Sequence, residues 1–325
     1  MPVLEFYRSR GIQLDLAVEA HALLRGDAQQ EIPGVSESKE EFENSKVTTV
    51  VIQDPAAAQM MGKAPGTYIT IDAQGLRESD PLIHDSIAEV LAQKLAELLE
   101  IQNIPQNAHI MLVGLGNWAA TPDALGPKVI SRVFVTRHLH KYIPEQMGPG
   151  TRPVSALSPG VMGITGIETA EIIRGAVEKV TPACVIAIDA LAASNVERIC
   201  STIQIADSGI NPGSGVGNTR SALDRNSLGI PVIAIGIPTV VHAEIIMYEA
   251  FNNLRKAVPG MSRQINDATL QQTVNNMLMP FGGHLTVTPK EIDSLINNAA
   301  RCVATALNQS LHPDITSENA NLFLQ

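Results

Sequence analysis

The sequence predicts an α/β fold, with a mostly parallel β-sheet flanked by helices, in a single domain that carries an N-terminal extension. First, apolar strand-like runs alternate along the chain with segments of helical spacing. Second, aromatic residues make up only 3% of the 325 residues, so the core must consist of Ile, Val, Leu and Ala, as in covered parallel sheets. Third, an apolar run, a tight glycine turn and a helix start follow one another between His109 and Gly126.

The individual elements follow from apolar periodicity and turn signals. Short apolar or β-branched runs predict strands at residues 47–52, 67–71, 109–113, 184–188, 202–205 and 231–236. Helical spacing predicts helices at residues 85–101, 127–139, 165–179, 242–256 and 288–311. Two of these helices are expected to begin at capping boxes, Thr165 with Glu168 and Thr288 with Glu291. Residues 1–46 are polar and charged, and by themselves they favour a frayed terminus over an arm or a pro-segment.

Composition excludes several classes of protein. The net charge of -10 argues against a general nucleic-acid binder, which would present a basic face. The first ten residues lack the apolar core of a signal peptide, and no apolar run is long enough to span a bilayer. The three cysteines have no CxxC spacing, and Cys184 is expected to be a small core residue. We therefore expect a cytoplasmic protein in a reducing compartment, with no membrane or nucleic-acid partner.

Two aspartates occupy positions where α/β proteins place their sites. Asp123 follows the glycine turn Gly114-Leu115-Gly116, and Asp189 follows the apolar run 184–188. Sites in open α/β sheets gather at the carboxyl ends of parallel strands. Two close carboxyls share a proton, so one activates a water while the other protonates the leaving group. The more ordinary interpretation is that Asp123 complements a helix dipole and Asp189 caps a turn.

Other motifs carry less weight. Asp207-Ser208-Gly209 matches the triplet of pepsin-like proteases, but those folds are nearly all β, so we expect a turn residue here. The glycine-rich loop 211–218 has no Gly-Lys-Ser/Thr ending and is not a P-loop, and no cofactor is expected. No HExxH motif is present. A metal held by Asp123, Asp189 and a distant histidine stays open as an alternative, because ligands need not be close in sequence.

Seven longer segments resemble the germination protease family, the endopeptidases of bacterial spores that degrade small acid-soluble spore proteins. They are VGLGNWAATPDALGPKV, VTRHL, RPVSALSPGVMGITGIETAEII, IAIDALAA, ADSGINPGSGVGN, LGIPVIAIGIPTVV and LTVTPKEID. The resemblance extends from residue 15 to residue 312. It implies an atypical aspartic protease, with a fold similar to the hydrogenase-maturation proteases. It also implies that the catalytic aspartates are Asp123, within TPDALGP, and Asp189, within AIDALAA.

The resemblance further implies a precursor that removes a short N-terminal segment from itself. Residues 13–20 match the region of the family's processing point, so we expect cleavage between Asp15 and Leu16. Residues 1–15 would then be a pro-segment and residues 16–325 a single peptidase domain. The local pattern, acid–aliphatic–Ala–x–Glu, is similar to the cleavage motif of the spore-protein substrates. A homotetramer in the cytoplasm of the spore core is implied as well.

Some expectations come from position alone. Gly114, Gly116 and Asn117 are candidates to line the site and to supply backbone or amide donors near the developing oxyanion. The chain departs from the family at His242, where members tend to have an acidic residue, and after about Lys256, where it is shorter. Two other hypotheses stay open: a metal-dependent maturation-type peptidase, whose relatives use acidic residues to contact nickel, and a non-catalytic scaffold of the same fold.

Overall fold

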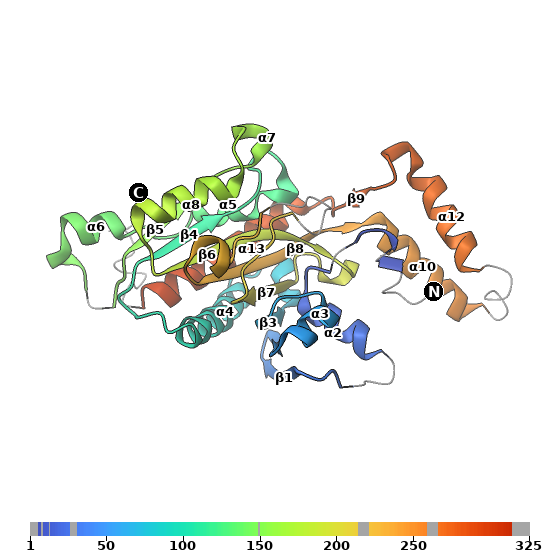
Figure 1. The fold of residues 1–325 in the computed structure, drawn as a ribbon, viewed down its shortest axis with the longest axis horizontal. Coiled ribbons are helices and arrows are strands. Elements are labelled where there is room, and N and C mark those ends of the chain that lie inside the picture. Colours follow the sequence, from blue (N-terminus) through green and yellow to red (C-terminus); the bar gives the residue numbers. More distant parts are fainter. Residues whose placement is uncertain are drawn as a thin grey trace.

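The computed structural model describes residues 6–7, 9–12, 14–26, 31–148, 150–213, 221–258 and 266–313. Its centre is a twisted sheet of nine described strands with helices on both faces (Figure 1). The α/β class that the sequence predicts is therefore confirmed. At one end of the molecule, α10 (Ala243–Ala257) and α12 (Asp267–Leu278) extend beyond the sheet.

The strands lie in the order β1-β2-β3-β7-β8-β6-β4-β5, and β9 pairs with β8. Their bounds are β1 Val35–Phe42, β2 Ser45–Ile52, β3 Gly66–Asp72, β4 Ile110–Gly114, β5 Val154–Leu157, β6 Cys184–Ala193, β7 Thr202–Ala206, β8 Val232–His242 and β9 Thr286–Val287. Strands β8, β6, β4 and β5 are parallel, whereas β1, β2, β3, β7 and β8 pair antiparallel. The prediction of a mostly parallel sheet is thus wrong in detail, because an antiparallel N-terminal meander joins the parallel half through β7.

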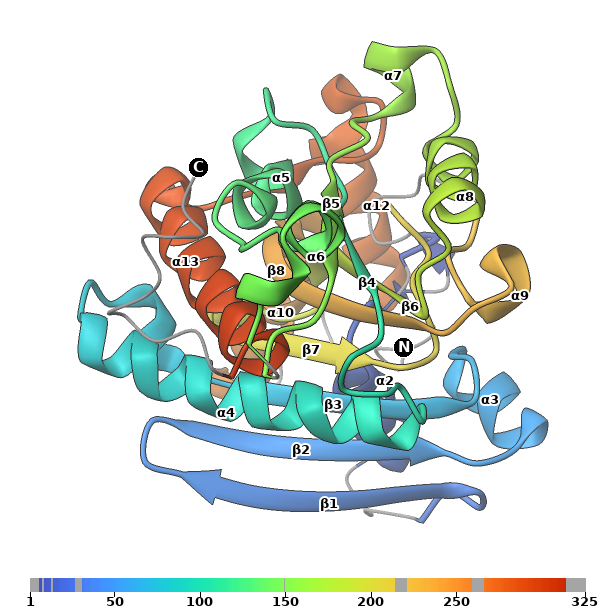
Figure 2. The ribbon, with the colours of Figure 1, turned by 90° about the vertical axis from the view of Figure 1, so that its left-hand side faces the viewer.

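Two long helices cover one face of the sheet. Helices α4 (Pro81–Ile101) and α13 (Ile292–Leu311) pack against each other and against this face (Figure 2). Alternate residues of the central strands supply the apolar surface beneath them, among them Ile188 of β6 and Ile235 of β8. Because side chains alternate along a strand, their neighbours Asp189 and Gly236 face the other side.

The other helices complete the two layers. They are α2 (Ala17–Arg25), α3 (Pro55–Met61), α5 (Leu125–Ile130), α6 (Arg137–Tyr142), α7 (Met162–Thr165), α8 (Thr169–Val180) and α9 (Arg225–Leu228). Helix α8 buries Ile173 and Val177 against β4 and β6, and α2 packs over β2 and β3. The sequence analysis did not predict α2, α3, α7, α9, α12, β1, β5 or β9.

Two helix predictions fail for identifiable reasons. The helix expected at 127–139 breaks after Ile130, because the Phe134 N–H donates to Asn308 of α13 (2.9 Å) and the Thr136 hydroxyl donates to the Arg152 carbonyl (2.6 Å). The capping boxes do not form either. Thr165 ends α7, and Thr288 donates to the Thr239 carbonyl of β8 (2.9 Å), so α8 and α13 begin three to four residues later than expected.

The N-terminal region is packed rather than frayed where the structure describes it. Phe6 is fully buried and stacks on Tyr248 of α10, with ring centroids 4.5 Å apart. Helix α2 buries Ala17 and Ala20 in a cluster with β2 and β3. The polar composition of residues 1–46 misled the prediction, because a few apolar side chains and a hairpin, β1–β2, are enough to attach the segment.

Candidate active site

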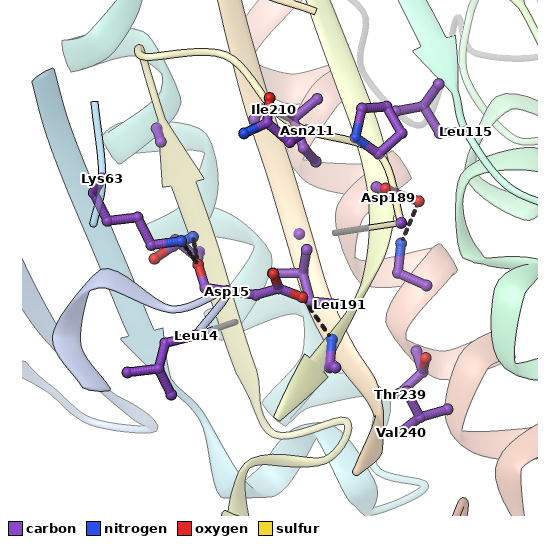
Figure 3. A pocket seen from close by; sticks show the side chains of 18 of the residues that line it. Leu14, Asp15, Lys63, Leu115, Asp189, Leu191, Ile210, Asn211, Thr239 and Val240 are labelled. Atoms are coloured by element: carbon purple, nitrogen blue, oxygen red, sulfur yellow. Dashed lines mark hydrogen bonds between the residues drawn. The ribbon is translucent and has the colours of Figure 1, made fainter. Parts of the chain in front are cut away.

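A cavity of about 810 Å³ opens at the carboxyl ends of β4 and β6, on the face of the sheet opposite α4 and α13. Its lining includes Asp15, Lys63, Asp123, Asp189 and Gln204. Figure 3 shows the cavity with Asp189 and Asp15 on neighbouring parts of its surface. The two aspartates predicted to be catalytic and the predicted processing site therefore share one cavity.

Asp189 lies on β6 and points into the cavity. The strand does not end at this residue, as the sequence suggested, but continues to Ala193. Asp189 is 4% exposed, and its Oδ1 accepts a hydrogen bond from the Ala190 N–H (2.9 Å). An acid on a strand of apolar residues therefore lies at the boundary between the core and the cavity.

Asp123 closes a short 3₁₀ turn, η2 (Thr121–Asp123), that follows β4. The Asn117 N–H donates both to Asp123 Oδ2 (2.8 Å) and to the Asp123 carbonyl (3.0 Å). The Thr239 hydroxyl of β8 donates to the Pro122 carbonyl (2.7 Å) and fastens the turn to the sheet. These bonds fix the carboxylate at the edge of the cavity before any substrate arrives.

Glycines allow this turn to approach the end of β4. Gly116 has φ 110°, and a Cβ there would overlap the Asp123 carbonyl oxygen. Gly114 and Gly126 face each other so closely that a Cβ on either would collide with the backbone of the opposite segment. Only glycine fits such contacts. The Gly-x-Gly turn thus allows the backbone at Asp123 to lie close against the end of β4.

The pairing of β4 with β6 brings the two acids together. Gly114 is the last residue of β4 and pairs with Ile188, and the Leu115 N–H donates to the Ile188 carbonyl (2.8 Å). Asp189 is the next residue along β6, so it flanks the loop from which Asp123 is held. Two carboxyls that line one cavity are suited to divide the roles of base and acid.

The candidate site-lining residues have different positions. Among the residues that the structure describes, the cavity lining includes Gly116 but neither Gly114 nor Asn117. The Gly114 carbonyl accepts from the Ser158 hydroxyl (3.3 Å), and Asn117 Oδ1 accepts from the Ala119 N–H (2.9 Å). Since the Asn117 N–H already donates to Asp123, this N–H holds the Asp123 carboxylate in place.

The predicted processing site is buried. Asp15 is 8% exposed and Leu16 is fully buried. Asp15 Oδ2 accepts from the Ala192 N–H of β6 (2.9 Å), three residues beyond Asp189. Helix α2 begins two residues after Asp15, so the predicted scissile bond lies where an extended segment enters a helix.

Glu19, in the first turn of α2, is a second buried acid near the predicted processing site. Burial raises the pKa of Glu19 to about 7, against the opposing effects of the nearby Ser194 and of the charge of Arg198. The Arg198 Nε lies 3.3 Å from Glu19 Oε1. Glu19 is the last acid of the acid–aliphatic–Ala–x–Glu pattern, so the pattern has a buried carboxyl at each end.

The other candidate motifs have structural positions. Asp207 Oδ1 accepts from the Thr67 N–H of β3 (2.7 Å) and its Oδ2 from Gln102 (2.9 Å), as befits a turn residue rather than a nucleophile-activating acid. Cys184 is buried in the core, as predicted, and His242 is the buried residue that precedes α10. The glycine-rich loop lies only in part within the described residues, since 214–218 fall outside them.

Two features are absent from the described part of the chain. No group of three or more His, Cys, Asp or Glu side chains is placed to hold a metal ion. No helix in the same residues combines the length and the apolar character that a bilayer crossing requires.

Comparison with known proteins decides the family. A sequence model of the family described as germination protease matches residues 14–257 and 250–324. The chain belongs to the germination protease family. It is 46% identical to a germination protease of Caldanaerobacter subterraneus subsp. tengcongensis over 324 residues, which cover 97% of this chain and 98% of that protein. Germination proteases of Bacillus cereus and Bacillus mycoides are 42% and 41% identical over alignments of 355 residues, with 96% of each chain covered.

Membership of the germination protease family makes the chain a peptidase of spore germination. Sequence reasoning nevertheless missed two polar residues that line the cavity, Lys63 and Gln204. One signal was available for Gln204, which stands at the centre of the apolar strand Thr202–Ala206. A buried amide in such a strand must find hydrogen-bond partners, and these partners are often functional.

Proposed function

We propose that this germination protease family member is an endopeptidase in which Asp123 and Asp189 activate a water molecule for attack on a peptide carbonyl. One carboxylate takes a proton from the water, and the other carboxyl protonates the departing nitrogen. No covalent acyl-enzyme forms in this scheme. The observation that carries the proposal is that both acids line the same cavity as Asp15, the residue before the predicted scissile bond.

The same observation supports self-processing between Asp15 and Leu16. The segment enters the cavity as a peptide substrate would, with the Asp15 side chain bound to the backbone of β6. Cleavage would convert a precursor with residues 1–15 into a peptidase that begins at Leu16. By the resemblance to the family, its substrates would be the small acid-soluble spore proteins, whose degradation it would initiate as a homotetramer in the cytoplasm of the spore core.

The test is to incubate the full-length chain in mildly acidic buffer and to sequence the new N-terminus. We expect Leu16 as the first residue, and a rate constant that falls about 10²- to 10⁴-fold in Asp123→Asn and in Asp189→Asn. The matched control is Asp85→Asn, an exposed aspartate on α4, which should process like the wild type. Turnover that persists in either site variant contradicts the proposal.

The rival hypotheses give different outcomes in the same assay. A metal-dependent peptidase loses processing after exhaustive chelation and regains it when the metal is restored, whereas the aspartate mechanism is insensitive to chelation. A non-catalytic scaffold shows no new N-terminus and does not cleave a spore protein under any of these conditions.

A further inference from the structure

The carbonyl of Asp15 accepts two side-chain hydrogen bonds inside the cavity. Lys63 Nζ donates at 2.8 Å (Figure 3), and Gln204 Nε2 donates at 3.1 Å. This carbonyl belongs to the peptide bond that we expect the protein to cut. A carbonyl oxygen with two donors, one of them cationic, is polarised toward attack at its carbon.

Gln204 also binds the backbone on the C-terminal side of the Asp15–Leu16 peptide bond. Its Oε1 accepts from the Ala17 N–H (2.7 Å), so one side-chain amide spans the backbone from residue 15 to residue 17. The two bonds fix the orientation of the amide, because a flipped group would place donor against donor. The contacts involve only backbone atoms of the segment, and any extended peptide could make them.

Gln204 and Asp189 line the cavity from the same face of the sheet, on strands separated by β8. Gln204 pairs with Gly236 on β8, and Gly236 pairs with Asp189 on β6. Residues paired across strands project from the same face, and two strand spacings place their Cα atoms about 10 Å apart. Gly236 has no side chain, and the Leu191 side chain of β6 packs directly over it, so an apolar group lies between the amide and the carboxyl.

Lys63 reaches the cavity because of the way α3 ends. Gly62 is left-handed, with φ 64°, and the Lys63 N–H returns to the Ala58 carbonyl (3.2 Å), which turns the chain sharply inward. Burial lowers the pKa of Lys63, while the charges of Asp15 and Glu19 act to raise it. A desolvated ammonium interacts more strongly with a developing negative charge than one in water.

The geometry points to Lys63 and Gln204 as the carbonyl-binding side of this site, which positions the scissile carbonyl and stabilises its oxyanion. The inference rests on the proposed function. A water oxygen bonds to the Asp15 carbonyl carbon, and the C=O electron pair moves to the oxygen held by Lys63 and Gln204. One aspartate takes the proton from the water. The C–N bond then breaks, the other aspartate protonates the Leu16 nitrogen, and the products are an Asp15 carboxyl and a Leu16 amine.

The experiment compares first-order rate constants for self-processing of the full-length chain. We expect Lys63→Met to slow processing about 10²- to 10³-fold, the effect of removing one oxyanion donor. Lys63→Arg keeps the charge and the donors and should recover most of the rate. Lys179→Met, an exposed lysine on α8, is the matched control and should process normally. Urea unfolding of each variant verifies that it is folded.

Gln204→Glu gives a readout that a structural role would not. The substitution keeps an acceptor for the Ala17 N–H but replaces the donor that faces the Asp15 carbonyl. We expect processing to slow about 10²-fold relative to the wild type at neutral pH, and this deficit to shrink at low pH, where a protonated carboxyl donates again. A deficit that does not change with pH overturns the role of the donor.

The outcomes separate the inference from the function beneath it. If the wild type is cut at Asp15–Leu16, Asp189→Asn is not, and Lys63→Met is cut at the wild-type rate or faster, then the inference fails and the proposed function stands. If the wild type is not cut at all, both fail.

Discussion

The cavity has two walls that are built in different ways. The acid wall, made of Asp123, Asp189 and Gly116, comes from the parallel half of the sheet, where backbone N–H groups and glycine contacts fix the carboxylates. The clamp wall, made of Lys63 and Gln204, comes from α3 and the antiparallel strand β7, and holds the N-terminal segment through two long side chains. The difference teaches that backbone groups hold the proposed reacting carboxylates in place, whereas the proposed peptide-binding side chains are held by their hydrogen bonds to the peptide itself.

A single methyl group should disable the acid wall. Gly116→Ala places a Cβ against the Asp123 carbonyl at a positive φ, so the turn that carries Asp123 must move. We expect self-processing to slow about 100-fold, the cost of misplacing a catalytic group by about 1 Å. The strained backbone should also lower the free energy of unfolding by about 1–3 kcal/mol. Both effects are measured on the purified full-length chain, by processing kinetics and by urea unfolding.

The same substitution elsewhere provides the control. Gly175 lies on the exposed face of α8, and a Cβ there would meet nothing within 4 Å. Gly175→Ala should raise the free energy of unfolding by about 0.5–1 kcal/mol and leave processing unchanged. Equal behaviour of the two variants would mean that the close approach at Gly116 does not position Asp123.

The free energy of unfolding should depend on the protonation of Glu19, which lies buried near the predicted processing site. Its pKa in the folded protein is raised to about 7, so the folded state binds this proton more tightly than the unfolded state. The stabilisation is complete below the ordinary glutamate pKa of about 4.5 and is lost as pH rises to about 7, a difference of about 3 kcal/mol. Urea unfolding in an Asp189→Asn background, which keeps the chain intact, measures it.

Glu19→Gln removes this group and should flatten that pH dependence. Glu178→Gln, on the exposed face of α8, serves as the control and should leave the dependence as it is. A slope that survives Glu19→Gln would show that another group is responsible.

The smallest effect on catalysis is expected at Asp207, the aspartate of the Asp-Ser-Gly triplet. Asp207→Ala leaves the Thr67 N–H and Gln102 without their acceptor, which should cost about 1–3 kcal/mol of stability. The rate of self-processing under native conditions should stay at the wild-type value. A loss of processing without a loss of stability would instead give Asp207 a chemical role and move the active site away from the acid wall.

The acid wall could be predicted from the sequence because its signals are local. The glycine turn that follows an apolar run and the acid within a second apolar run both report the parallel half of the sheet. The family resemblance then selected Asp123 and Asp189 from the other acids. The continuation of β6 to Ala193 was missed, since a short apolar run does not show where a buried strand ends, and Gly114 and Asn117 do not line the cavity as expected.

The clamp wall could not be predicted in the same way. Lys63 and Gln204 are 141 residues apart, and they meet at one carbonyl only because of the turn at Gly62 and the position of β7. No spacing in the sequence predicts that contact. The same reason explains why the predicted helix at residues 127–139 does not form throughout. The Phe134 N–H donates to Asn308 of α13 instead of to a carbonyl one helical turn earlier. Tertiary hydrogen bonds decided these regions, against local preference.

The most direct test of the account is whether the aspartates of a chain cut the Asp15–Leu16 bond of that same chain. The half-life of the full-length protein should stay constant over a hundredfold dilution, and Asp189→Asn should remain intact in an equimolar mixture with the wild type. A half-life that lengthens in proportion to dilution, or cleavage of the inactive variant by the wild type, would contradict the claim that both acids and this bond share one cavity.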